Sequence, residues 1–233
     1  MHIEGNPITQ AQLAEIVAMA KPCNLAGANL KDANLAGVNL AGANLKGARL
    51  YGANLKSANL AGAYLKDAYL EGANLKDAYL EGASLKDANL TGANLTGANL
   101  KDVRLYGANL TGANLADANL EGVNLKGVTL ARANFAGANL TGVNLEGVYL
   151  YGVNLEGAKG IMSLSIPGLT THGDTLYIVR HVGGLMVKFG YFYGDLEEFE
   201  QHVQENYGSG KQGILYAGVI QLLHVWEKLA PSM

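Results

Sequence analysis

The sequence predicts an all-β solenoid, in which the chain coils around an apolar axis and bends once every five residues. Three observations point to this fold class. From Leu25 to Leu155 every fifth residue is leucine, with Phe135 as the one exception. The residue two places before each leucine is Ala or Val, except for Cys23 at the start. The second residue after the leucine is Gly in 19 of 27 units, so the repeated unit reads A-N-L-x-G.

A five-residue period fits neither an α-helix nor a straight strand. In a helix, leucines five apart would be rotated by about 140° and would spiral around every side. In a strand, successive leucines would fall on opposite faces, because side chains there repeat every two residues. The chain must therefore turn in every unit, with Ala and Leu facing the axis and Asn facing outward. Gly, or Asp in its place, suits the corner because it accepts a positive φ. The spacing alone allows three, four or five corners per coil.

The run of A-N-L-x-G units from Asn24 to about Gly160 resembles the pentapeptide-repeat family, whose A(D/N)LXX units follow one another in tandem. The resemblance implies a right-handed quadrilateral β-helix with about 20 residues in each of about seven coils. Side chains one coil apart would then stack in columns along the four faces. Residues 24–160 are assigned to this β-helix.

Basic and aromatic residues gather in neighbouring columns of the predicted rod. The candidate interaction surface consists of Lys46, Lys66, Lys86, Lys126, Arg49, Tyr51, Tyr64 and Tyr69. Basic residues among tyrosines are typical of a strip that binds protein or nucleic acid. A second interpretation is favoured, because lysines beside Asp67 and Asp87 on a solvent face usually serve solubility and protect strand edges.

Another column has asparagine at every position. Stacked amides can hydrogen-bond along a column, as they do in fibrillar sheets. A ladder with a structural role is therefore predicted for Asn34, Asn54, Asn74, Asn94, Asn114, Asn134 and Asn154.

The residues before the repeats predict a helix that caps the first coil. Thr9 and Gln12 match the capping box found at helix N-termini. An apolar stripe at helical spacing runs from Leu13 to Ala20, and Pro22 ends it. A solenoid end without a cap would expose apolar side chains and unpaired backbone. Residues 1–23 are therefore assigned to an N-terminal capping helix.

Residues 161–233 lack the repeat and predict a small C-terminal α+β module, which acts as a cap or a dimerisation unit. Thr175–Val182 and Leu185–Phe192 have the composition of two strands. Gly183 and Gly184 lie between them and suit the turn of a β-hairpin.

Two helices are expected after the hairpin. Asp195 and Glu198 suit the start of a helix that reaches about Asn206, and the G-D-L-E-E-F stretch there resembles short tails of some bacterial and phage-encoded pentapeptide proteins. The last helix, about Ile214–Leu229, is apolar on more than one side, which favours burial or a homodimer contact. Its candidate self-association residues are Ile214, Val219, Leu222, Leu223 and Trp226.

Composition argues against several classes of protein. The 17 Lys and Arg against 20 Asp and Glu give a net charge of −3, which is too mild for an obligate partner of nucleic acid or acidic lipid. One cysteine excludes a disulfide framework and a cysteine-rich metal cluster. No apolar run reaches the roughly 18 residues of a membrane span and no secretion signal is recognised, so a cytoplasmic protein is expected. The tail histidines fit no metal motif, and no catalytic residue, metal or cofactor is predicted.

These features favour a non-catalytic scaffold that binds a protein partner, of unknown identity, through flat β-helix faces. The family resemblance implies an alternative, a DNA-mimicking modulator of DNA gyrase or topoisomerase. B-DNA carries one negative charge per roughly 1.7 Å of its axis. Residues 24–160 carry 12 basic against 11 acidic residues, so the charge of the repeats disfavours the mimic.

Overall fold

A computed structural model of the chain divides it into two compact units, which meet in the sequence at Lys159 and Gly160. The structure describes residues 22–145, 148, 150–164, 176–181, 184–190 and 192–229. The predicted N-terminal capping helix lies outside the described residues, apart from Pro22 and Cys23. The two units are therefore considered one at a time.

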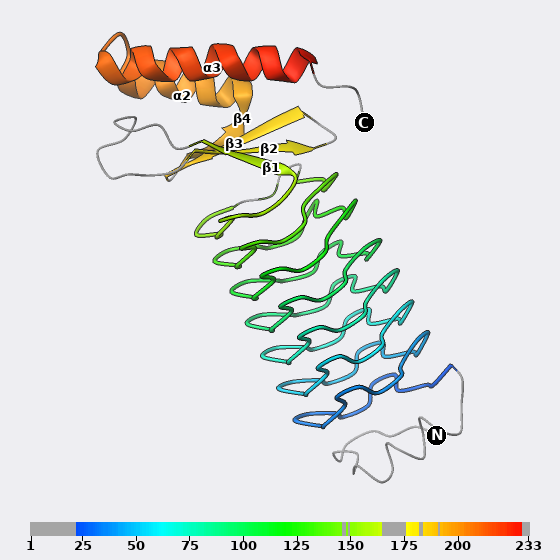
Figure 1. The fold of residues 1–233 in the computed structure, drawn as a ribbon. Coiled ribbons are helices and arrows are strands. Elements are labelled where there is room, and N and C mark those ends of the chain that lie inside the picture. The colour runs from blue at the N-terminus through cyan, green and yellow to red at the C-terminus, as the bar shows by residue number, and fades with distance from the viewer. Residues whose placement is uncertain are drawn as a thin grey trace. The chain divides into compact units, whose positions relative to one another are not determined.

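The first unit is a β-solenoid whose coils stack through parallel backbone pairing (Figure 1). The bridges join residues 20 apart, from Asn24↔Asn44 to Asn139↔Lys159. The chain turns once in every five residues, so one coil has four corners. Ser84 shows the pairing: its N–H donates to the Ala63 carbonyl at 2.9 Å, and its carbonyl accepts from the Leu65 N–H at 2.7 Å. Of the three corner numbers that spacing allowed, four is the one observed.

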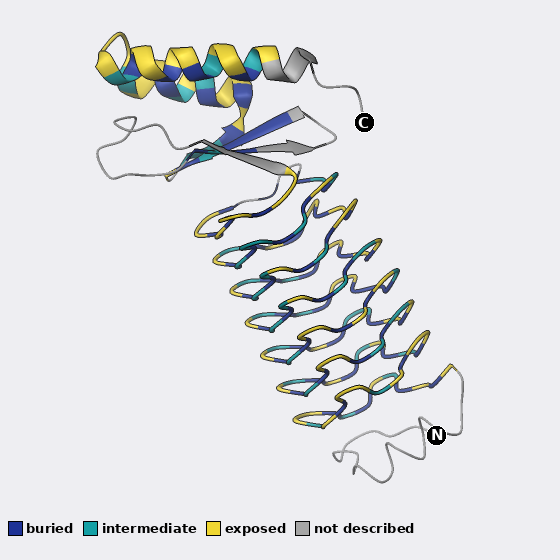
Figure 2. Cartoon of the chain, in the orientation of Figure 1, coloured by how far each residue is buried: buried dark blue, intermediate teal, exposed yellow. Residues whose placement is uncertain are grey.

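The interior of the solenoid is made of the leucines and of the alanines or valines two places before them. Figure 2 shows buried and exposed residues alternating along each coil. Phe135 replaces one leucine and is 1% exposed, and Cys23 is buried at an alanine position. Burial of one leucine side chain is worth about 1.5–3 kcal/mol, so the stacked leucines are the main stabilising contribution of the rod.

Asparagine and glycine together shape each corner. The asparagine side chain accepts the backbone N–H two residues ahead, as Asn59 Oδ1 does from Ala61 at 3.1 Å. This Asx turn explains why asparagine dominates the outward position. Wherever the structure describes it, the second residue after the leucine has a positive φ, whether it is glycine or one of the substitutes such as Asp87 at 57° and Arg132 at 60°. Glycine is therefore the least strained residue at that place.

The second unit contains a four-stranded antiparallel sheet in the order β1-β2-β3-β4. The strands are β1 (Ile161–Leu164), β2 (Leu176–His181), β3 (Gly184–Phe189) and β4 (Phe192–Asp195). The hairpin expected from the sequence is β2 with β3, with His181 opposite Gly184. The predicted second strand, 185–192, was too long, because Gly190 adopts a φ of 53° and turns the chain into β4. β1 was not predicted.

Two helices complete this unit, α2 (Leu196–Tyr207) and α3 (Lys211–Leu229). The capping box at the start of α2 is present: Asp195 Oδ1 accepts the Glu198 N–H at 2.8 Å, and Glu198 Oε2 accepts the Asp195 N–H at 2.9 Å. The helices cover one face of the sheet (Figure 1). Their shared core contains Leu176, Ile178, Val187, Phe189, Phe199, Val203, Tyr216, Val219 and Leu223.

Candidate functional site

Arg49, Tyr51 and Tyr69 come together on the surface of the solenoid. Arg49 and Tyr69 both stand at the asparagine position of the repeat, and their backbones pair in adjacent coils. Tyr51 follows Arg49 after the buried Leu50, so it emerges at the next corner. Its ring stacks on Tyr69, with 5.5 Å between the centroids and 25° between the planes. The coil repeat therefore builds an aromatic pair next to a guanidinium group.

The aromatic pair borders a depression of about 780 Å³, which we call the tyrosine–arginine depression. It extends over three successive coils, because residues 27, 47 and 67 stack in one corner column. Gly27 and Gly47 leave the base of the depression open, and a Cβ built on either would meet nothing within 4 Å. The lining residues are Gly27, Asn29, Gly47, Arg49, Tyr51, Asp67 and Tyr69.

The charges around the depression are unevenly paired. Asp67 lies 3.9 Å from Lys66 Nζ, and Glu71 accepts a hydrogen bond from Asn89 Nδ2 at 2.6 Å. The guanidinium of Arg49 makes no hydrogen bond or ion pair with any residue that the structure describes. The depression therefore offers an unpaired positive charge beside two tyrosine rings.

The hydroxyl of Tyr51 keeps its proton in this setting. Burial raises its pKa above the ordinary value of 10.0, Glu71 and Tyr69 raise the pKa further, and Arg49 lowers it. At neutral pH Tyr51 is therefore a hydrogen-bond donor beside the cationic Arg49.

The other predicted surface residues lie around the depression or beyond it. Tyr64 is 42% exposed and stands at the asparagine position of the adjoining face, and the exposed Lys46 and half-buried Lys66 follow on that side. Lys86 lies in a later coil, where its Nζ is 5.5 Å from the ring centre of Tyr106. Lys126 lies in a coil further along. The sequence identified the aromatic and basic residues of the depression but not Gly27 and Gly47 at its base. Their spacing of 20 and 40 residues before Asp67, which places all three in one column, could have indicated them.

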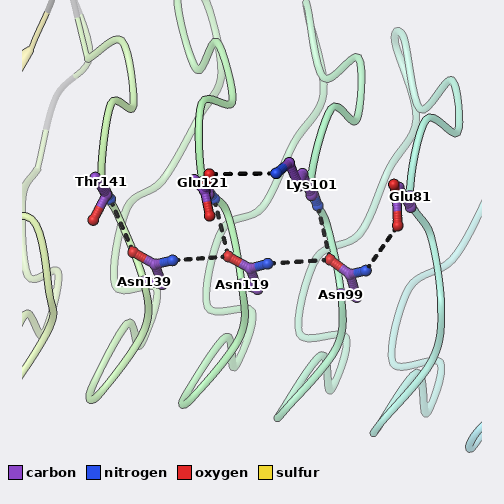
Figure 3. Close-up of polar contacts among 7 residues, drawn as sticks. All are labelled: Glu81, Asn99, Lys101, Asn119, Glu121, Asn139 and Thr141. Atoms are coloured by element: carbon purple, nitrogen blue, oxygen red, sulfur yellow. Dashed lines mark hydrogen bonds and ion pairs between the residues drawn. The ribbon is translucent and has the colours of Figure 1, made fainter. Parts of the chain in front are cut away.

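Asparagine columns hold two faces of the rod by side-chain hydrogen bonds. On the face predicted from sequence, Nδ2 of Asn54, Asn134 and Asn154 donates to the asparagine one coil earlier at 3.1, 2.9 and 3.0 Å. A second, unpredicted ladder runs through the column of Asn119 (Figure 3). There Asn139 donates to Asn119 at 3.0 Å, and Asn119 donates to Asn99 at 3.4 Å. An amide serves such a column because it both donates and accepts, so these faces are structural.

The predicted self-association residues of α3 divide into two groups. Val219 and Leu223 are buried in the core of their own unit, so their assignment to a surface needs correction. Ile214 and Leu222 are 67% and 66% exposed, and Val225 is exposed beside them. The side chain of Trp226 lies outside the described residues. The outward apolar stripe of α3 therefore consists of Ile214, Leu222 and Val225, with Leu215 at its edge.

Two further findings limit what the described residues can do. They contain no group of three or more His, Cys, Asp or Glu side chains that could hold a metal ion. Their helices are also too short or too polar to cross a membrane.

A solenoid of five-residue units, with leucine inside and asparagine outside, defines a pentapeptide-repeat fold. The chain belongs to the family of pentapeptide repeats: the family model matches it in eight copies over residues 23–62, 63–102, 88–127 and 129–159. The search of curated proteins gave no match.

Several solved structures are similar to the chain. HetL from the cyanobacterium Nostoc, a pentapeptide repeat protein involved in heterocyst differentiation regulation, is 33% identical over 58% of this chain and 71% of its own, with a TM-score of 0.37. Rfr23 from the cyanobacterium Cyanothece is 29% identical over 64% and 98%, with a TM-score of 0.36. QnrB1, a plasmid-mediated fluoroquinolone resistance protein, is 21% identical over 57% and 77%, with a TM-score of 0.40.

Proposed function

We propose that this chain is a non-catalytic scaffold that binds a protein partner at the tyrosine–arginine depression. The observation that carries the proposal is the stacked pair of Tyr51 and Tyr69 beside the unpaired Arg49. Tyrosine and arginine are the surface residues that most often dominate the binding energy of protein interfaces. The coil backbone is paired on both sides at these positions, so the side chains are presented by a rigid support.

The solenoid is suited to binding a partner at its surface, and we find no support for a catalytic role. Its described interior is filled by leucine, alanine and valine, with Phe135 and Cys23 as the other members, so it holds no cluster of titratable side chains. None of the family or structure matches points to a catalytic family. The near-balance of charge over residues 24–160 also gives no support to mimicry of the DNA polyanion.

The binding proposal is tested by affinity capture with matched variants. The full chain is immobilised, and the proteins retained from a cell lysate are quantified by mass spectrometry. Arg49→Ala/Tyr69→Ala is expected to lose a partner that the unchanged protein and Arg104→Ala/Tyr79→Ala retain. The control replaces the same residue types at the same repeat position, on exposed sites outside the depression. Equal retention by both double variants would refute the assignment of the surface.

We further propose that the C-terminal unit forms a homodimer through the outward stripe of α3. Between Lys211 and Glu227 the helix has no lysine, arginine or acidic side chain, and exposed Ile214 and Leu222 lie in this stretch. Light scattering on the full chain is expected to give twice the monomer mass. Leu222→Glu is expected to give a monomer, whereas Gln204→Glu, at an exposed position of α2 outside the stripe, keeps the dimer. A monomeric unchanged protein would refute the proposal.

A further inference from the structure

We propose that the tyrosine–arginine depression takes an extended acidic segment of the partner, with a carboxylate on Arg49 and an apolar or aromatic side chain on the rings of Tyr51 and Tyr69. This inference rests on the protein-binding function proposed above and adds the chemistry of the partner. A guanidinium binds a carboxylate through two parallel hydrogen bonds, and its planar donors give that contact a fixed direction.

The distribution of paired and unpaired charges selects an anionic ligand. Asp67 lines the depression and lies 3.9 Å from Lys66 Nζ. Glu71 Oε1 accepts a hydrogen bond from Asn89, whereas its Oε2 is buried without a hydrogen-bond partner in the described part of the chain. The cationic groups are different. Among the described residues, the side chains of Arg49, Lys31 and Lys46 have no acidic partner within ion-pair distance. Of these three, Arg49 lines the depression, so its guanidinium is the cation that is open to an incoming chain.

The aromatic pair supplies the apolar half of the site. The rings of Tyr51 and Tyr69 are already stacked, so a ligand side chain can pack on them without first ordering them. Tyr69 is 42% exposed, which leaves contact area for a ligand. An aromatic or apolar side chain would therefore gain contact there at a small entropic cost.

The dimensions of the depression suit a short extended peptide. It spans three coils about 4.8 Å apart, or about 10 Å, and an extended chain covers that distance with about three residues. Gly27 and Gly47 leave room at the base for the main chain of such a segment. The backbone donors there are already used, since Gly27 N–H binds the Lys46 carbonyl and Gly47 N–H binds the Lys66 carbonyl. The segment must therefore be held by its side chains, which places the specificity on Arg49 and the tyrosines.

The probe for this site is the capped peptide acetyl-Glu-Ser-Phe-Ser-Glu-amide. Its two glutamates flank the phenylalanine at the same spacing, so either chain direction presents a carboxylate two residues from the ring. Three companion peptides replace both glutamates by glutamine, both by lysine, or the phenylalanine by alanine. The full chain contains four arginines and is labelled with ¹⁵N-arginine, so that Arg49 and Arg104 can be followed separately by NMR.

The acidic peptide is expected to shift the Arg49 signals and to leave those of Arg104 unchanged. Arg104 is a matched control because it is exposed at the same repeat position but lies outside the depression. Calorimetric titration should show about a tenfold or greater rise in Kd with Arg49→Gln and no change with Arg104→Gln, because a charged hydrogen-bonded contact has about that value. The glutamine and alanine peptides should each bind more weakly than the acidic aromatic one.

Two results would overturn the inference. One is equal or tighter binding of the lysine peptide, which would mean that Asp67 and Glu71 control the site. The other is an unshifted Arg49 signal at millimolar acidic peptide in a protein whose circular dichroism is that of a folded solenoid. Either result can occur while Arg49→Ala/Tyr69→Ala still loses a partner from the lysate. In that case the scaffold function stands and the acidic specificity fails.

Discussion

Replacement of Gly107 by alanine tests how one coil packs on the next. Gly107 has a φ of +72°, and a Cβ built there would overlap Asp87 Oδ1 and lie 3.4 Å from Asp87 Cγ. The carboxylate of Asp87 therefore occupies the space that the missing side chain leaves. Gly112 is the matched control, because its φ is +64° but a Cβ would meet nothing within 4 Å.

The structure predicts different losses in the free energy of unfolding for the two substitutions. A left-handed alanine costs about 1–2 kcal/mol, and the smaller entropy of the unfolded chain returns about 0.4–1 kcal/mol. Gly112→Ala is therefore expected to lower the free energy of unfolding by about 1 kcal/mol. Gly107→Ala must also push the Asp87 side chain off its preferred rotamer, which adds about 0.5–1.5 kcal/mol. Its total is about 2 kcal/mol.

Equilibrium urea unfolding followed by circular dichroism measures both changes, with the slope of each curve checked because repeat arrays can lose two-state behaviour. The double variant Asp87→Gly/Gly107→Ala should recover the extra loss, which gives a coupling energy of about 1 kcal/mol in a double-mutant cycle. Equal losses for Gly107→Ala and Gly112→Ala, with no coupling to Asp87, would refute this packing of aspartate over glycine.

Three further predictions concern the core, the amide ladder and the depression. Leu85→Ala removes a side chain that is fully buried and should lower the free energy of unfolding by about 3–5 kcal/mol in urea; a loss below 1 kcal/mol would contradict its place in the core. Asn119→Asp loses the donor to Asn99 and should destabilise by about 1 kcal/mol at pH 7. A loss below about 0.3 kcal/mol would contradict the contribution of this ladder. Glu71→Gln should lower the pKa of Tyr51, measured by ultraviolet titration against Tyr51→Phe, yet leave the pKa above 10.0 because burial is its larger cause.

The sequence predicts the solenoid well because the five-residue period determines both which side chains are buried and where the chain turns. Leucine every fifth residue requires an inward side chain and a corner in each unit, and the described coils have both. The number of corners does not follow from this pattern, since any closed coil would bury the leucines. It is set by the backbone pairing of residues such as Asn24 and Asn44, which period alone leaves open.

The C-terminal unit is less predictable because its signals are local and ambiguous. Gly190 lies in a stretch with the composition of a strand, but its positive φ ends β3 at Phe189. Both sides of α3 are apolar, so the sequence could not tell that Val219 and Leu223 face the core while Leu222 faces outward. The depression is an intermediate case. The 20-residue coil predicts that Arg49 and Tyr69 lie in one column. The hollow of the depression, however, depends on which corner residues lack side chains.

The four-cornered coil makes the surface sensitive to a kind of mutation that the interior tolerates. Every unit places leucine in the same internal setting, so the gain or loss of one unit would leave the core packing unchanged. It would, however, carry every later side chain to the neighbouring face. If a unit were lost between Arg49 and Tyr69, the two would no longer stack, although the rod would still fold. Only insertions or deletions of a multiple of 20 residues keep every side chain on its face. Selection for binding would therefore restrict the length of insertions and deletions to multiples of 20 residues, whereas selection for stability alone would also allow multiples of five.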